Sequence, residues 1–180
     1  MEQDPLPTLE LEEDAALVLA ARAGERLAFG QLYQRYHRMV HGVLLARVSP
    51  TLADDLVQDV FLKAMVQLPK LRDPASFAGW LAAIARNRAL DHYRRTRESE
   101  AMPEEIAVQE SASAEAEAHA ALQAIQSLPE TYRESLTLRL VEGMTGPEIA
   151  QRTGMTPDSV RVNLHRGMKL LRERLERRRA

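Results

Sequence analysis

Apolar residues recur every three or four positions through most of this chain, the spacing that places them on one face of an α-helix. Residues 25–48 show the pattern most clearly. Their apolar stripe consists of Phe29, Leu32, Tyr33, Tyr36, Val40, Val43 and Leu44. Ser49-Pro50 interrupts the pattern, because a residue that precedes proline is disfavoured in the helical conformation. The stretch therefore predicts an amphipathic helix with one buried face.

The same period predicts three more helices in the first half of the chain. Residues 14–24 form a short one, which Gly24 ends. In residues 51–68 the apolar face consists of Leu56, Val57, Val60, Phe61, Ala64 and Met65. In residues 77–95 the inward positions are Phe77, Trp80, Leu81, Ile84 and Leu90. The segment "PKLRDPAS" between these two contains two prolines and predicts a loop.

Start and stop signals divide residues 128–179 into three helices. They are, in order, Pro129, Gly143, a capping box of Thr145 and Glu148, Gly154, and Thr156-Pro157. The last two helices are joined by a tight turn that contains glycine, and the final helix is basic. This combination is typical of a helix-turn-helix.

The predicted helix-turn-helix has an internal and an external set of positions. Ile149, Ala150, Met155, Val160 and Leu164 are the expected packing positions. The outer surface then carries Asp158, Ser159, Arg161, Val162, His165, Arg166 and Lys169. Arginine can bond guanine through two hydrogen bonds, and Lys or Arg can hold phosphates. The plainer alternative is a solvated basic face on the terminal helix of a bundle.

Composition supports an all-α fold and narrows the class of protein. Aromatic residues make up only 4% of the chain, and Ala, Leu and Arg outnumber the residues that favour strands. Cysteine is absent, so disulfides and thiolate metal sites are excluded. No apolar run approaches bilayer length, and the acidic start is not a secretory signal. A cytoplasmic protein without membrane insertion is expected.

Charge is unevenly distributed although the formal net charge is only −2. Residues 86–97 contain five Arg and one Asp, and residues 161–179 contain eight Lys or Arg and two Glu. Residues 98–117 contain seven Glu and no Lys or Arg. We therefore expect two small helical domains with polyanion-binding surfaces, joined by an acidic linker. The predicted segments are an acidic tail at 1–13, a first domain at 14–97, a linker at 98–119 and a second domain at 120–180.

Three motifs in order carry a resemblance to a known family. They are "DDLVQDVFLKA" (54–64), "FAGWLAAIARNRALDHYRR" (77–95) and the run from "LPETYRESL" to "LLRERL" (128–175), preceded by "AFGQLYQRY". The chain resembles the extracytoplasmic-function group of bacterial sigma factors in the sigma-70 family, the promoter-recognition subunits of RNA polymerase. The resemblance implies a region 2-like domain for the −10 element, a region 4-like domain for the −35 element, and neither catalysis nor a cofactor. Implied partners are core RNA polymerase, promoter DNA and an anti-sigma factor.

The resemblance also assigns residues to three binding surfaces. The polymerase-binding residues are Asp55, Gln58 and Asp59, whose alternative is an ordinary solvated helix face. The −10 DNA-binding residues are Lys70, Arg72, Arg86, Asn87, Arg88, Arg94 and Arg95. The −35 DNA-binding residues are Ser159, Arg161, Val162, His165, Arg166 and Lys169. The chain departs from the usual pattern at Val162 and Asn163, and at Gly167, which costs a helix roughly 1 kcal/mol.

Several alternatives remain beside this reading. The acidic linker either passes through the polymerase as a mimic of nucleic acid or serves as a solubilising tether. The whole chain is either a sigma factor or a sigma-like adaptor that titrates an anti-sigma factor without binding promoter DNA. A free-standing repressor would leave the first domain unexplained. His37 and His41 are spaced for a metal, but no third ligand lies nearby in the sequence, so an ordinary exposed or half-buried pair is expected.

Overall fold

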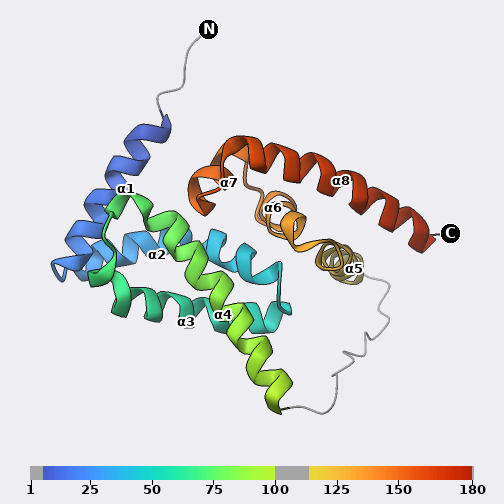
Figure 1. Ribbon diagram of the computed structural model, residues 1–180, viewed down its shortest axis with the longest axis horizontal. Coiled ribbons are helices and arrows are strands. Elements are labelled where there is room, and N and C mark those ends of the chain that lie inside the picture. Colours follow the sequence, from blue (N-terminus) through green and yellow to red (C-terminus); the bar gives the residue numbers. More distant parts are fainter. Residues whose placement is uncertain (1–5, 100–113, 180) are drawn as a thin grey trace, which may run out of the picture.

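The computed structural model describes residues 6–99 and 114–179 of the 180-residue chain (Figure 1). Within these ranges every regular element is a helix, which confirms the all-α fold class. The N-terminal domain comprises α1 (Leu6–Arg22), α2 (Arg26–Leu45), α3 (Pro50–Gln67), the 3₁₀ turns η1 (Leu68–Lys70) and η2 (Pro74–Ser76), and α4 (Phe77–Ser99). The C-terminal domain comprises α5 (Ala114–Gln126), α6 (Glu130–Leu140), α7 (Gly146–Thr153) and α8 (Pro157–Arg179).

The N-terminal domain packs α1, α3 and α4 around α2. Its fully buried side chains include Leu32, Tyr36, Met39, Val40, Val43, Leu44 and Leu81. Most of them are members of the predicted stripes, so the helical period identified the core faces correctly. Aromatic rings close the centre of the domain, where Tyr36 and Phe77 meet edge to face with centroids 5.3 Å apart.

Several predicted details of this domain are wrong. Leu90, Met65 and Tyr33 are 47%, 49% and 37% exposed, although the helical period predicts all three on apolar faces. Ala89 is completely buried in place of Leu90, because a small residue lets α4 lie close to its neighbours. α1 begins at Leu6, so its first turns fall within the predicted acidic tail.

The C-terminal domain has its own apolar cluster between α5, α6 and α8. The buried members are Ala124, Ile125, Leu128, Leu136 and Leu171. Gly167 on α8 faces this cluster, and a Cβ there would lie 2.9 Å from Leu136 Cδ1 and 3.1 Å from Tyr132 Cβ. The glycine therefore allows α8 to cross α6 closely. From the sequence alone, Gly167 is expected only to destabilise its helix. α5 begins at Ala114, inside the predicted linker, and the rest of that linker lies outside the described residues.

The helix-turn-helix formed by α7 and α8 has the predicted local signals. Thr145 Oγ1 accepts a hydrogen bond from Glu148 N, and Glu148 Oε2 accepts one from Thr145 N at 2.7 Å. The bond from Thr145 N, with a second from Thr145 Oγ1 to Glu148 Oε2 at 2.8 Å, holds the pKa of the Glu148 carboxyl below its usual value. Gly154 ends α7 with φ +73°, a left-handed conformation that glycine adopts without strain. Ile149, Ala150 and Val160 are buried where the two helices meet, as predicted.

The two domains also pack against each other. α6 and α7 lie on α2 and α4, and α6 lies between α8 and α2 (Figure 1). Leu138, Met144 and Ile149 of the C-terminal domain are buried in the same apolar cluster as the core of the N-terminal domain. We call this arrangement, in which the two domains are in contact, the closed arrangement.

Candidate nucleic-acid interface

The exposed face of α8 carries all six residues assigned to the −35 element. Ser159, Arg161, Val162, His165, Arg166 and Lys169 are each exposed on this helix. Arg161 is tethered only loosely, by a bond of 3.3 Å to the exposed Asp158. A surface ion pair of this kind contributes little, so the guanidinium can exchange Asp158 for another acceptor.

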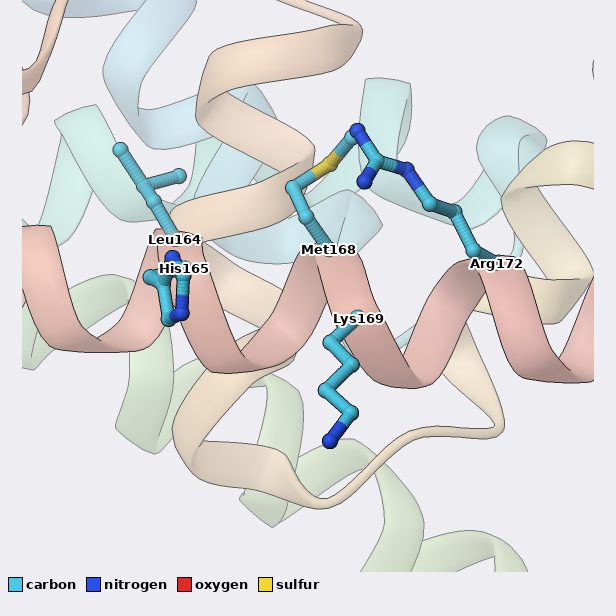
Figure 2. A pocket seen from close by; sticks show the side chains of 5 residues that line it. All are labelled: Leu164, His165, Met168, Lys169 and Arg172. Atoms are coloured by element: carbon cyan, nitrogen blue, oxygen red, sulfur yellow. The ribbon is translucent and has the colours of Figure 1, made fainter.

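An open groove runs along α8 beside these residues (Figure 2). Leu164, Met168 and Arg172 point to one side of the helix, and Lys169 points to the other (Figure 2). The apolar members face the domain core, while His165 and Lys169 lie at the outer edge of the groove. A helix with an apolar inner face and cationic outer face fits the shape and charge of a DNA major groove.

Asn163 does not belong to this outer face. It is half-buried, and its Nδ2 donates to the sulfur of Met155 at 4.0 Å within the helix-turn-helix. Val162 and Asn163, where the sequence departs from the family pattern, therefore lie on different faces of α8, since Val162 is 38% exposed on the outer face. Only Val162 is positioned to contact a partner.

The outward face of α3 carries the residues assigned to polymerase binding. Asp55 and Gln58 are exposed, and Asp59 is partly so. The same face continues with exposed apolar residues that the sequence reading missed, Leu62 and Val66 at 57% and 76% exposure. Their spacing of three or four residues from the polar group was a usable signal, because it marks a second stripe opposite the core face.

The residues assigned to the −10 element are spread along α4 and the preceding loop. Lys70, Arg72, Asn87 and Arg94 are exposed. Asn87 and Arg94 are seven residues apart on α4, about two helical turns, so they lie on the same side of the helix. The side chain of Arg95 lies outside the described residues.

Two of the assigned arginines are paired inside the molecule. Arg88 donates to Asp59, so a residue assigned to DNA and one assigned to polymerase are brought together. Arg86 donates Nε to Glu134 Oε2 at 3.0 Å and Nη2 to Glu134 Oε1 at 2.7 Å. These hydrogen bonds raise the pKa of the Arg86 guanidinium and outweigh the opposing effect of burial. Arg86 therefore contributes no free charge to the surface of the closed molecule.

His37 and His41 of α2 lie next to each other, and the second also meets a carboxylate of the other domain. The rings of His37 and His41 stack with centroids 6.3 Å apart, and His41 Nδ1 lies 2.8 Å from Glu142 Oε1. Within residues 6–99 and 114–179 no group of three or more His, Cys, Asp or Glu is placed to hold a metal ion. No described helix has the length and apolar character needed to cross a bilayer.

Fold and site together define a two-domain helical protein whose C-terminal domain is a helix-turn-helix with an exposed cationic helix. Family models match both parts in order, sigma-70 region 2 at residues 32–99 and sigma-70 region 4 at residues 118–171. The chain belongs to the extracytoplasmic-function group of the sigma-70 family of RNA polymerase sigma factors.

Curated relatives support this membership over most of the chain. CarQ, an RNA polymerase sigma factor of Myxococcus xanthus, is 34% identical over 86% of this chain and 92% of its own length. SigZ, an RNA polymerase sigma factor of Bacillus subtilis, is 32% identical over 81% of this chain and 85% of its own. SigD, an ECF sigma factor of Mycobacterium tuberculosis, is 30% identical over 97% and 90%.

Solved structures show the same fold. CnrH, solved in complex with the cytosolic domain of CnrY, is 27% identical with a TM-score of 0.64 and covers 91% of this chain and 97% of its own. The sigma factor RpoE of Bartonella quintana, solved with the anti-sigma factor NepR, is 21% identical with a TM-score of 0.57 and covers 82% and 95%. At that identity the second likeness concerns the fold alone.

Proposed function

We propose that this chain acts in the cytoplasm as a dissociable initiation subunit that joins core RNA polymerase and recognises the −10 and −35 elements of a promoter. The observation that carries the proposal is the exposed, largely polar and cationic set of residues on α8, within a chain that matches both sigma regions in order. No catalytic role is assigned to the chain.

The −35 element is bound by α8 in the major groove. Arg161, His165 and Arg166 lie on the outer face of the helix, where they reach base edges, while Lys169 lies nearer its middle and holds a phosphate. Ser159 and Val162 complete the contact at the end that enters the groove. The exposure of all six residues supports these roles.

The −10 element is held along α4 and the loop before it. Asn87 offers an amide that can replace the pairing lost by an extruded base. Lys70, Arg72, Arg94 and Arg95 hold the phosphates of the melted strand. The exposure of Lys70, Arg72, Asn87 and Arg94 supports this role.

The polymerase is bound by the outward face of α3. Asp55, Gln58 and Asp59 pair with cationic and polar side chains of a partner helix, and Leu62 and Val66 extend the contact with apolar surface. An anti-sigma factor is a further expected partner; CnrH, at 27% identity, is itself solved in complex with a cytosolic protein domain.

Reconstitution tests the proposal directly. The purified chain is mixed with core polymerase and a fragmented genomic promoter library, and transcripts are mapped by their 5′ ends. We expect a small set of start sites with shared −10 and −35 sequences that disappear when the chain is left out. Stable binding of an anti-sigma protein without any selected start site would instead support the adaptor.

A further inference from the structure

The sulfur of Met155 lies where three parts of the C-terminal domain meet. Met155 itself is half-buried in the turn between α7 and α8. Ser135 of α6 donates its hydroxyl to Met155 Sδ at 3.9 Å, and Asn163 of α8 donates Nδ2 to the same sulfur at 4.0 Å. One thioether thus links the turn of the helix-turn-helix to both neighbouring helices.

The two donors are poorly matched to this acceptor. A thioether sulfur accepts hydrogen bonds only weakly, and a buried polar group without a good partner costs free energy. Ser135 is completely buried, and among the described residues its hydroxyl has no other acceptor. Asn163 is half-buried. A stronger acceptor attached to the sulfur of Met155 would therefore satisfy donors that the thioether leaves underused.

The two distances suit an oxygen atom placed between the sulfur and either donor. Both are about 1 Å longer than ordinary O–H···O and N–H···O separations. An oxygen bonded to the sulfur and turned toward Ser135 or Asn163 would lie within hydrogen-bond distance of that donor. Methionine sulfoxide carries such an oxygen, which makes the side chain polar where the thioether is apolar.

Methionine is the only residue of this chain at which sulfur can be oxidised, since the sequence has seven Met and no Cys. Hydrogen peroxide can supply the oxygen atom. The sulfur lone pair attacks one peroxide oxygen, so that an S–O bond forms and the O–O bond breaks. The proton of the transferred oxygen passes to the second oxygen, which leaves as water. The sulfur is oxidised and the peroxide is reduced, so no further reactant is needed.

We propose that Met155 is an oxidation site, and that Ser135 and Asn163 are the positioning residues that receive its sulfoxide oxygen. The helix-turn-helix then keeps its fold, and α8 its orientation, when hydrogen peroxide oxidises the turn. A sulfoxide that meets no donor in a packed region instead disrupts the packing. Only the DNA measurement below rests on the proposed role of α8, so the inference goes beyond that function.

The test compares reduced and oxidised forms of the full chain. Ser135→Ala combined with Asn163→Leu removes both donors, and neither residue is assigned to DNA or polymerase. Met155→Leu is the matched control, because it keeps a similar apolar volume without the sulfur and reports the effect of oxidising the other methionines. Each chain is treated with the same series of hydrogen peroxide concentrations. Peptide mass spectrometry follows oxygen uptake at Met155 and at the exposed Met65.

Two properties are measured before and after oxidation. The first is the equilibrium of unfolding in urea, and the second is the affinity for a labelled, random-sequence DNA duplex. In the wild type we expect both to change no more than in Met155→Leu. In the double variant we expect oxidation to raise the unfolding equilibrium constant about tenfold and to weaken duplex binding about fivefold. The reason is that a half-buried oxygen without a donor must turn toward water and displace the turn.

Four results would overturn parts of the proposal. Complete oxidation of Met65 with Met155 unchanged overturns the oxidation site. Equal destabilisation of the oxidised wild type and double variant, or equal tolerance by both, overturns the role of the two donors. Weaker duplex binding by the oxidised wild type, with its unfolding unchanged, overturns the retained orientation of α8.

Two complications leave the test decisive. If the double variant fails to fold in its reduced form, as judged by its helical circular dichroism, Ser135→Ala alone takes its place. A wild-type chain that binds no duplex in either form would count against the proposed function. The unfolding measurement would still decide whether Ser135 and Asn163 receive the oxygen.

Discussion

The absence of a side chain at Gly167 sets how closely α8 lies on α6. We predict that Gly167→Ala destabilises the protein by about 1 kcal/mol, because overpacking against Leu136 and Tyr132 exceeds the gain in helix propensity. Gly30→Ala is the control, at an exposed helical site with open space, and should stabilise by about 0.5–1 kcal/mol. Urea denaturation measures both. Equal stabilisation by the two changes would show that the close crossing is unimportant.

The side-chain amide of Asn87 is the group proposed to bind an extruded base of the −10 element. It is exposed on α4 between two arginines that have internal partners, so it is free to meet an extruded base. We predict that Asn87→Ala weakens promoter opening by about tenfold or more while leaving core binding within twofold, since one or more hydrogen bonds to a base are lost. Opening is measured as transcription from a duplex promoter relative to a pre-melted one. Equal loss on both templates contradicts the assignment.

At the scale of single elements, α3 has two faces with different tasks. The inward face fills the core, and the outward face continues from its acidic group to Leu62 and Val66. We predict that Leu62→Gln with Val66→Gln weakens core polymerase binding about tenfold and leaves the unfolding midpoint unchanged, because exposed apolar groups contribute to an interface rather than to the fold. Leu19→Gln on α1, itself 54% exposed, serves as the control. Fluorescence titration against core enzyme gives the affinities.

The elements themselves could largely be predicted from the sequence, because each carries its own period and its own start and stop residues. The capping box at Thr145 and the stop at Gly154 are examples, since local chemistry alone determines them. The exposure of Leu90 could not be predicted, because burial depends on how far neighbouring helices wrap around α4. Nothing local distinguishes Glu134 from the exposed Glu130 four residues earlier. Its role depends on Arg86 and Arg47, which precede it by 48 and 87 positions in the sequence.

At the scale of the whole molecule, a histidine makes closure dependent on pH. His41 of α2 faces Glu142 just after α6, Asp54 of α3, and His37 on its own helix. Arg38 Nε lies 3.6 Å from the same Glu142. The hydrogen bond to Glu142 is the main cause that raises the pKa of His41 in the closed state, against the opposing effect of burial. Separation of the domains removes Glu142 from the ring.

Because the pKa of His41 is higher in the closed state than in the open state, closure of the two domains takes up protons. The contribution of His41 is complete at pH values below its open-state pKa and is lost as pH rises through the raised closed-state pKa. We predict a larger closed fraction at about pH 6 than at about pH 8, with His41→Gln removing most of the difference. Probe distances between the domains measure it. A pH response that persists in the variant would assign it to other groups.

The Arg88–Asp59 pair joins the face turned toward polymerase to the helix turned toward DNA. A cationic group on the core enzyme that captures Asp59 would release Arg88 for a phosphate. By thermodynamic reciprocity, a promoter strand that captures Arg88 would free Asp59 and tighten the hold on the enzyme by the same factor. Binding of the chain to core polymerase and binding of the chain to promoter DNA would then be cooperative, through the Arg88–Asp59 pair.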